Sequence, residues 1–220
     1  MGLHVAKSEG ILADCSNRAD NFSFERHLHG KGYSCVAGCD EAGRGPLAGP
    51  VVAAGVVLPA DCDHSCFLDS KILPHRRRLD LCDRLREIGA FIGIGVVSEG
   101  QIDRINILQA SLLAMRLAID NIAGTAPDFL LVDGKFQVPL AIAQEALVKG
   151  ESKSASIAAA SIVAKVARDR IMEDLHRQYP VYNFHRHKGY PTKEHREAIR
   201  AHGPCPVHRM SFRGVREYVG

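Results

Sequence analysis

Short apolar runs of strand length alternate along this chain with longer stretches in which apolar residues recur at helical spacing. The runs predict five strands, at residues 34–40, 51–58, 91–97, 129–133 and about 146–148. The longer stretches predict four helices, one after Pro74, one at about 107–122 that Pro127 closes, and others at 156–175 and 193–201. We expect the first two strands to form an antiparallel hairpin and the third to pair with the second. The pattern therefore predicts an α/β domain with a mixed sheet.

The patterning also divides the chain in two. Residues 1–30 are polar and lack a clear period, so we expect an N-terminal extension that is loosely ordered or helical. Residues 31–220 contain all the predicted strands, and a chain of 220 residues suffices for one sizeable core. We therefore expect a single main domain, without internal repeats.

Composition argues against a membrane protein or a disordered chain. Hydrophobic residues make up 46% and charged residues 24%, which is ordinary for a globular protein. No window approaches the ~18–20 consecutive apolar residues of a membrane span. Residues 1–30 lack the apolar centre of a signal peptide, so we expect a cytoplasmic protein without membrane contact.

The seven cysteines include no Cys-x-x-Cys pair. Cys62 and Cys66, with His64 between them, leave a zinc site conceivable. Cys35 and Cys39 have the same loose spacing, but a strand would bury them as small apolar side chains.

Positive charge gathers near the C-terminus. The formal net charge is +3, yet from residue 181 onward eight Lys or Arg stand against three Glu, a local balance of +5. Such clustering favours a polyanion such as a nucleic-acid backbone, although a solvated helix face would have the same composition. We expect His185, His187 and His195 in this region to contact phosphate, and we assign none of them a catalytic role.

Four acidic residues stand at predicted strand ends or turns: Asp40, Glu41, Asp133 and Glu151. If the strands are neighbours, these carboxylates meet at one edge of the sheet, where they repel one another unless a divalent cation lies among them. Such a cluster suits two-metal hydrolysis of a phosphodiester. Taken singly, Asp133 or Glu151 would more often be a turn former or a helix cap. Since one face of a strand cannot hold both neighbouring side chains, we expect Glu41 to belong to the bend after Asp40.

The run Asp-Glu-Ala-Gly-Arg-Gly-Pro-Leu-Ala-Gly-Pro-Val-Val-Ala-Ala, which starts at Asp40, resembles the signature of the ribonuclease HII family. That family cuts at ribonucleotides embedded in DNA, and further family-like motifs follow in order to about residue 215. The resemblance implies a ribonuclease H-like fold, with a mixed β-sheet flanked by helices and a helical C-terminal part. It also implies two divalent ions, Mg²⁺ or Mn²⁺. The implied metal ligands and catalytic residues are Asp40, Glu41, Asp133 and Glu151.

Glu151 departs from the family pattern, which usually has aspartate in its Lys-Gly-Asp-Ser element. Glutamate is one methylene longer, so either the backbone retreats or a metal shifts. Our hypothesis is that Glu151 remains a ligand with an altered metal preference or rate.

The resemblance assigns substrate contacts as well. Gly43, Arg44 and Gly45 would read the 2′-hydroxyl that distinguishes RNA from DNA, and glycine lets a ligand lie directly against the main chain. Tyr190, in His-Lys-Gly-Tyr, would stack on the sugar after the ribonucleotide. Lys71 would contact a backbone phosphate or help to order the site. Without the resemblance, Tyr190 could equally be a half-buried aromatic residue and Lys71 a solvated one.

These implications predict a monomeric endoribonuclease that acts on RNA–DNA hybrids and on single ribonucleotides in duplex DNA, in support of DNA replication and repair. It would cut 5′ of the ribonucleotide and leave 3′-hydroxyl and 5′-phosphate ends. The residues by themselves reach only metal-dependent phosphoryl chemistry on a polyanion. Two other hypotheses stay open: a phosphohydrolase of small molecules, and a non-catalytic hybrid-binding module in which Glu151 marks a decayed site.

Overall fold

The computed structural model describes residues 20–67 and 73–219 of the chain. At its centre lies a sheet in the order β3-β2-β1-β4-β5. The strands are β1 (Val36–Ala42), β2 (Val51–Val57), β3 (Phe91–Val97), β4 (Phe129–Asp133) and β5 (Ala143–Leu147). β1, β4 and β5 run parallel, whereas β2 pairs antiparallel with both β1 and β3. The predicted hairpin and mixed sheet are confirmed.

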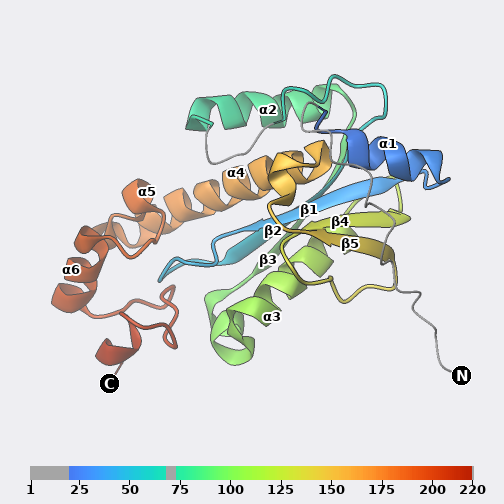
Figure 1. Ribbon diagram of the computed structural model, residues 1–220. Helices are drawn as coiled ribbons and strands as arrows, with labels where there is room; N and C mark the ends of the chain where they lie inside the picture. Colours follow the sequence, from blue (N-terminus) through green and yellow to red (C-terminus); the bar gives the residue numbers. More distant parts are fainter. Residues whose placement is uncertain (1–19, 68–72, 220) are drawn as a thin grey trace, which may run out of the picture.

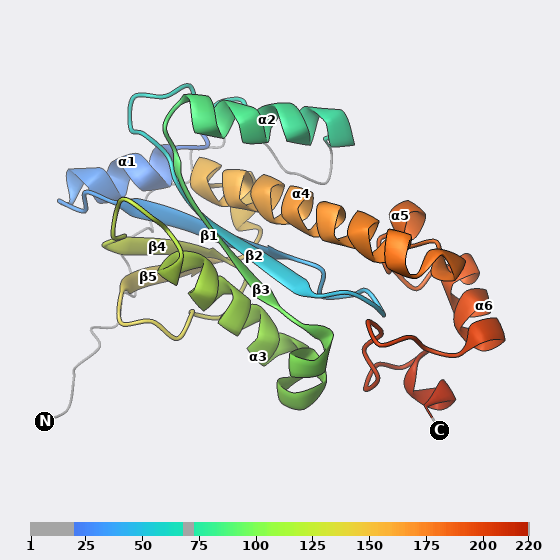
Figure 2. The same ribbon diagram turned by 180° about the vertical axis from the view of Figure 1, so that it is seen from behind.

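Helices cover both faces of the sheet (Figure 1). α3 (Glu99–Asp120) lies on one face and α4 (Ala155–Gln178) on the other, with α2 (His75–Glu87) stacked on the outer side of α4. Figure 2 shows the same layers from behind. Every residue of β2 is buried, because helices cover the strand on both sides. This explains why its sequence is a continuous Val and Ala run instead of an alternating one.

α4 approaches the sheet closely because the first half of the helix consists largely of alanine and serine. A Cβ atom on Gly38 of β1 would lie 2.1 Å from the carbonyl carbon of Ser156, so only glycine fits beneath the helix at this point. The small residues thus place α4 directly over the strand that leads to Asp40.

The boundaries of α3 differ from the prediction. The helix begins at Glu99, well before residue 107, because the Ser98 side chain caps it by accepting a hydrogen bond from the Gln101 N–H. The backbone leaves helical geometry at Asn106, with φ of 66°, so the apolar run after 107 marks only the second part. α3 ends at Asp120, and Pro127 does not close it.

α1 (Ser23–Gly30) packs its apolar side against β1 and β4. Its Glu25 is buried and accepts hydrogen bonds at the start of α4, from the Ser154 hydroxyl at 2.6 Å and from the Ser156 N–H at 3.0 Å. Burial raises the pKa of the Glu25 carboxyl. The helix therefore belongs to the packed body of the molecule.

The C-terminal part has its own apolar cluster at the far end of α4 (Figure 1). Its elements are η2 (Pro180–Tyr182), α5 (Phe184–His187), α6 (Lys193–His202) and η3 (Arg216–Tyr218). Backbone hydrogen bonds tie it to the loop after β1, among them Leu47 N–H to the Gly189 carbonyl at 2.8 Å. The helical C-terminal part is confirmed. None of the helices within residues 20–67 and 73–219 is long and apolar enough to cross a membrane.

Candidate active site

The ends of β1 and β4 bring two of the predicted acids together. The strands pair in parallel with Cys39 opposite Val132, so Asp40 and Asp133 are the next residues on neighbouring strands. Ligand sites of such sheets lie at the carboxyl ends of the strands. Asp40 is only 5% exposed, and its pKa is raised well above its usual range by burial first and then by the charges of Glu41 and Asp133.

Glu41 lies within β1, so its prediction as part of a bend is wrong. The strand continues to Ala42 because β2 pairs with it there, through Glu41 opposite Ala53. Burial raises the pKa of the Glu41 carboxyl, while the guanidinium of Arg44, 3.2 Å away, opposes that shift. The antiparallel ladder thus extends the strand past both acids.

Glu151 lies in η1 (Gly150–Ser152), which follows β5. Its side chain is nearly buried, and its Oε2 atom accepts a hydrogen bond from the Ser161 hydroxyl of α4 at 3.2 Å. The backbone N–H of Gly150 donates to Asp133 Oδ1 at 2.6 Å, so η1 is joined directly to the end of β4. The structure therefore places the segment that contains Glu151 against the end of β4, where Asp133 lies.

A hollow of about 470 Å³ opens at this edge of the sheet. Its lining includes Asp40, Glu41, Asp133, the loop at 43–45 and Tyr190. Glu151 does not line the hollow but contacts Ser161, which does. The Ser161 side chain also acts on Asp40, where it opposes part of the rise in pKa, so this serine lies between the fourth acid and the first.

The donor set fits a hard divalent cation. Carboxylate oxygens are the ligands that Mg²⁺ and Mn²⁺ prefer. Burial and mutual repulsion raise the pKa of Asp40 and of Glu41, and a cation among them would offset both effects. In the part of the chain that the structure describes, no three His, Cys, Asp or Glu side chains are already gathered into a metal-holding group. The side chains would therefore have to close around the ion.

The loop after β1 borders the hollow from the other side. Gly43 has φ of +99°, and a Cβ atom there would lie 2.1 Å from the Nε atom of Arg168, so glycine is required on both counts. A Cβ atom on Gly45 would lie 3.8 Å from the Tyr190 ring, which is 44% exposed. Folding thus places the predicted tyrosine beside Gly45 and Arg44, although they lie far apart in the sequence.

Two buried arginines hold this loop, and no pattern in the sequence indicated them. Arg209 donates hydrogen bonds to the carbonyl oxygens of Gly43 at 2.6 Å, Arg44 at 2.9 Å and Gly49 at 2.8 and 3.0 Å.

Arg168 donates to the carbonyl oxygens of Ala48 at 3.1 Å, Pro50 at 3.0 Å and Lys188 at 2.9 Å. It therefore joins the loop to the segment that precedes Tyr190. Desolvation lowers the pKa of Arg168 to about 10 and that of Arg209 to about 9, so both stay charged at neutral pH.

Basic groups complete the hollow. Lys165 and Arg78 line it, and both lie near the buried Asp169. Burial lowers the pKa of the Lys165 ammonium, and its ion pair with Asp169 opposes that shift. The predicted contact residue Lys71 lies outside the described residues.

The prediction of phosphate contacts is wrong for two of the three C-terminal histidines. His187 is 8% and His195 0% exposed, whereas His185 lies at the surface. Sequence reasoning took the local basic charge as a guide, but α5 and α6 turn these two imidazoles inward against Phe184.

Residues of the two cysteine pairs, Cys35/Cys39 and Cys62/Cys66, contact other groups in the fold. Cys35 Sγ lies 3.2 Å from the Thr125 hydroxyl, Cys39 is buried in β1, and the His64 ring stacks on Phe22. Within residues 20–67 and 73–219, neither pair belongs to a group of three side chains that could hold a metal.

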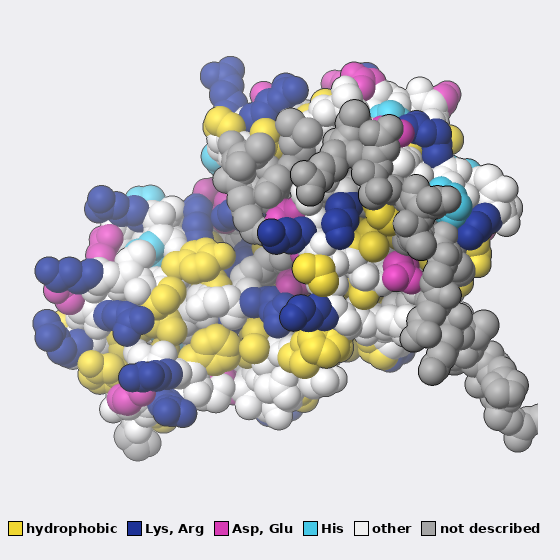
Figure 3. Space-filling view, viewed as in Figure 1, with side chains coloured by type: hydrophobic (Ala, Val, Ile, Leu, Met, Phe, Trp, Pro, Cys, Tyr) yellow, Lys and Arg dark blue, Asp and Glu magenta, His cyan; other side chains and the backbone are white. Residues whose placement is uncertain are grey.

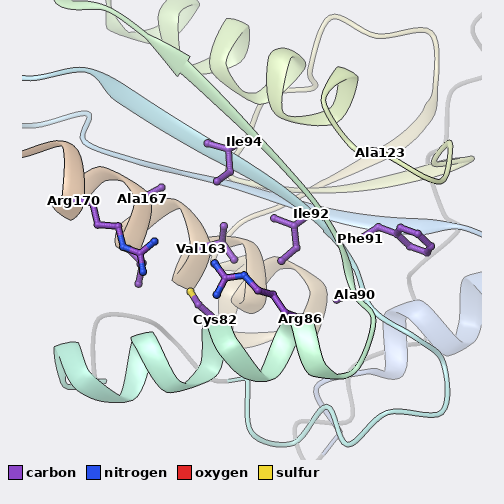
Figure 4. Close-up of a pocket in the computed structure, with 11 residues that line it drawn as sticks. Cys82, Arg86, Ala90, Phe91, Ile92, Ile94, Ala123, Val163, Ala167 and Arg170 are labelled. Atoms are coloured by element: carbon purple, nitrogen blue, oxygen red, sulfur yellow. The ribbon is translucent and has the colours of Figure 1, made fainter.

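A second hollow, of about 320 Å³, lies between α2, β3 and α4 (Figure 4). Apolar side chains such as Ile92, Ile94 and Val163 line it, together with Arg86 and Arg170. No carboxylate is among its lining residues, and none of the predicted site residues lies there.

A mixed sheet in this strand order, with acids at the carboxyl ends of β1 and β4, defines a protein of the ribonuclease H-like fold. Solved structures agree with this assignment. Ribonuclease H2 from Pyrococcus horikoshii OT3 superimposes with a TM-score of 0.69 at 26% identity, over 84% of this chain and 97% of that chain. Bst-RNase HIII in complex with Mn²⁺ has a TM-score of 0.66 at 21% identity, over 84% and 68% of the two chains, and shows likeness of fold.

Sequence comparison defines the family. The ribonuclease HII family profile matches residues 37–215. Ribonuclease HII of Desulfotalea psychrophila is 67% identical over 91% of this chain and 90% of its own length. That of Syntrophobacter fumaroxidans is 51% identical over 91% and 86%. The chain belongs to the ribonuclease HII family, and it is therefore a ribonuclease H, an endonuclease that acts on the RNA of RNA–DNA hybrids.

Proposed function

We propose that this enzyme also cuts duplex DNA on the 5′ side of a single embedded ribonucleotide, and so serves ribonucleotide removal in DNA replication and repair. One observation carries the proposal: Tyr190 and the loop at 43–45 line the same hollow as three carboxylates. The arrangement suits the reading of one 2′-hydroxyl at the place of cleavage.

Asp40, Glu41, Asp133 and Glu151 would hold two divalent ions, Mg²⁺ or Mn²⁺. When bound, such ions supply an activated water and charge stabilisation for in-line displacement, with 3′-hydroxyl and 5′-phosphate products. Glu151 would bind an ion after a movement that releases it from Ser161, since its carboxylate accepts a hydrogen bond from the Ser161 hydroxyl in this structure. The protein's own contribution is to exclude bulk water from Asp40 and to keep the acids aligned at the strand ends.

The other lining residues would bind and orient the nucleic acid. The main chain of Gly43 and Gly45 and the guanidinium of Arg44 would contact the ribonucleotide, and the exposed ring of Tyr190 would stack on the next sugar. Lys165 would contact a backbone phosphate, and so would Lys71, as the family resemblance implies.

Positive charge near the hollow fits a long polyanion better than a small phosphate ester. Figure 3 shows Lys and Arg side chains spread over the C-terminal part, around α5 and α6, with few acidic ones between them. The balance of +5 from residue 181 onward is the sequence counterpart of this surface. We expect the enzyme to act as a monomer in the cytoplasm, where its DNA substrate is.

The test uses duplex DNA with one internal ribonucleotide, incubated with Mg²⁺, Mn²⁺ or a chelator, with products mapped to the nucleotide. We expect a metal-dependent cut immediately 5′ of the ribonucleotide. Cleavage of long hybrids alone would overturn the proposal. Binding that survives chelation, together with no product in Mg²⁺ or Mn²⁺, would instead favour a decayed site. Competition by a small phosphate ester would favour the phosphohydrolase hypothesis.

A further inference from the structure

Three buried histidines lie beside Tyr190 and have no part in the chemistry described so far. His187 of α5, His195 of α6 and His208 are 8%, 0% and 1% exposed. The rings of His187 and His195 stack with centroids 4.5 Å apart at an angle of 19°. The Nε2 atoms of His195 and His208 lie 3.1 Å apart, which is hydrogen-bond distance.

Groups at the two ends of the His195–His208 pair fix where the protons lie. The backbone N–H of Cys205 donates to His208 Nδ1 at 3.0 Å, so this nitrogen is bare and the proton of His208 is on Nε2. His208 Nε2–H then donates to His195 Nε2, which leaves the His195 proton on Nδ1. His195 Nδ1–H donates in turn to the carbonyl oxygen of Tyr190 at 3.0 Å.

The opposite direction of donation fails at both ends. The Cys205 carbonyl oxygen also lies 3.2 Å from His208 Nδ1 and could accept a proton placed there. Such a proton would point the Cys205 N–H at a second donor and leave the Tyr190 carbonyl against a bare nitrogen of His195. Only one direction satisfies a fixed donor at one end and a fixed acceptor at the other.

This chain of hydrogen bonds ends on the backbone of the residue that borders the carboxylate hollow. The Tyr190 carbonyl accepts from His195 and from the Thr192 N–H at 2.8 Å, and the Tyr190 N–H donates to the His187 carbonyl at 2.9 Å. Both backbone groups of Tyr190 are thus held by this cluster, while its ring stays exposed at the hollow.

We propose that His195 is a positioning residue: through hydrogen bonds of fixed direction from Cys205 by way of His208, it sets the Tyr190 backbone and thereby supports selection of the ribonucleotide. The proposal rests on the function proposed above for Tyr190. His195 touches neither substrate nor metal in this scheme, since it acts through the tyrosine carbonyl.

The arrangement requires neutral imidazoles. An added proton on His195 or His208 would place two N–H groups opposite each other or against the Cys205 N–H. Desolvation lowers the pKa of both to about 4, which keeps them neutral in the range where the enzyme works.

Few charges approach the pair from the elements around it. His187 adds a like-charge effect on both imidazoles, and the Cys205 thiol lies 3.1 Å from His208 Nδ1. Glu194, His185 and Arg186 act on the stacked His187. None of these groups supplies a buried counter-charge that would favour the protonated pair.

The test compares two variants with different amide positions. In His195→Asn the side-chain N–H can take the place of Nδ1 and still donate to Tyr190, whereas in His195→Gln the amide falls near the place of Nε2. His202→Asn, on the exposed end of α6, is the matched control. KM and kcat are measured on duplex DNA with one ribonucleotide, and folding is checked by the melting temperature.

We expect His195→Gln to raise KM about three- to tenfold, the effect of removing one hydrogen bond, with kcat changed less. His195→Asn and the control should stay within about twofold of wild type. As the pH falls towards 4, wild type takes up a proton on His195 and His195→Asn does not, so the activity ratio of the variant to wild type should rise. Titration of the carboxylates is common to both proteins and cancels in this ratio. A folded Gln variant with wild-type KM, or equal reductions in Asn and Gln, would overturn the positioning role.

A spectroscopic readout separates this inference from the proposed function. ¹⁵N shifts of the free enzyme should report the proton on Nδ1 of His195 and on Nε2 of His208 at pH 7. The opposite tautomers would overturn the inference even in an active enzyme. Failure of wild type to cut at a single ribonucleotide, with the expected tautomers present, would refute the proposed function and with it the role of Tyr190.

Discussion

At the scale of single residues, the surroundings of the acids disfavour their charged forms. Asp40 is almost fully buried, and burial together with the charges of Glu41 and Asp133 raises its pKa, which opposes ionisation. An ionised Asp40 therefore costs folding free energy at neutral pH when no cation is present. Conflicts of this kind concentrate at functional sites, where a ligand removes them.

Replacing Asp40 by Asn should have opposite effects on stability and activity. In a chelator, Asp40→Asn should melt at or above the wild-type temperature, because a buried charge is gone. Activity should fall by at least about a hundredfold, since stabilisation by a bound metal contributes several kcal/mol. Mn²⁺ should raise the melting temperature of wild type more than that of the variant. Asp120→Asn, on the surface of α3, serves as the control. A less stable variant with an undiminished Mn²⁺ shift would contradict the role of Asp40.

Glu151 allows a second prediction at this scale. Its carboxylate already reaches Ser161, so shortening it in Glu151→Asp should weaken that hydrogen bond and change how the acid meets a metal. We expect a changed ratio of Mg²⁺- to Mn²⁺-supported rates in steady-state kinetics. Ser161→Ala is the companion variant, because it removes the same hydrogen bond and keeps the glutamate. Identical metal profiles in wild type and Glu151→Asp would count against a special role for glutamate.

At the scale of elements, the site is assembled by loops that other segments hold in place. The loop after β1 has few bulky side chains of its own to fix it. Arg209 and Arg168, from a C-terminal segment and from α4, donate to its carbonyl groups in place of a partner strand. Buried carbonyl groups need such donors, which explains why two guanidinium groups are buried here.

Replacing Arg209 should loosen this loop. Arg209→Met leaves several buried carbonyl groups without a donor, so we expect a decrease on the order of 3 kcal/mol in the free energy of unfolding. Arg209→Lys should recover only part of it, because an ammonium lacks the planar fork. Urea unfolding measures both, with the exposed Arg213→Met as the control. Wild-type stability in Arg209→Met would show that water replaces the guanidinium.

At the scale of the whole molecule, a sheet-centred body is joined to a basic, histidine-rich C-terminal part. Backbone hydrogen bonds between the two parts run through the loop that borders the hollow, and Asp103 of α3 accepts others from Met210 and Ser211. Stability of the C-terminal part and geometry of the site are therefore linked. At this scale we expect pH to change the stability of the protein and salt to change its binding of nucleic acid.

Acidification should destabilise the protein through His195 and His208. Their pKa is about 4 in the folded state, against 6.5 for an ordinary imidazole, so the unfolded chain takes up protons that the folded protein refuses. Stability is present above pH 6.5 and decreases as the pH falls towards 4, by about 2 kcal/mol per histidine between pH 7 and pH 5.

Urea unfolding at both pH values, in a chelator, measures this effect. His195→Asn should remove about half of the pH dependence. The raised pKa values of Glu25 and Asp40 act in the opposite direction, but they cancel in the comparison of the two proteins. An unchanged pH dependence in the variant would place the titrating groups elsewhere.

Salt should weaken binding through the basic surface of α6. Replacing Lys193, Arg196 and Arg200 by Gln should lower affinity for an RNA–DNA hybrid and reduce the slope of log affinity against log salt by about 1 for each phosphate that is no longer neutralised. Filter binding in a chelator over a salt series measures this. The same replacement of Arg84, Arg86 and Arg116, on α2 and α3, controls for net charge. An equal effect of both triple variants would argue against a local binding surface.

Local patterns in the amino-acid sequence were enough to predict the features that depend on each segment alone. Burial imposes a period on apolar residues, so four of the five strands and three of the four helices were predicted close to their places. The fifth strand, β5, begins at Ala143, three residues before the predicted start. Acids that follow apolar strands indicated where chemistry lies, and the motif around Asp40 indicated which family. The predicted start of α3 was wrong because neither the serine cap nor the break at Asn106 is visible as an apolar period.

Only the tertiary structure determined which polar groups contact one another. Arg209 binds carbonyl groups up to 166 positions away in the chain, and no local pattern marks such a pair. The same holds for Glu151 beside Ser161 and for the inward turn of His187 and His195. A hydrogen bond depends on distance and direction between segments that the fold brings together, whereas burial of an apolar residue needs only the right side of its own helix or strand.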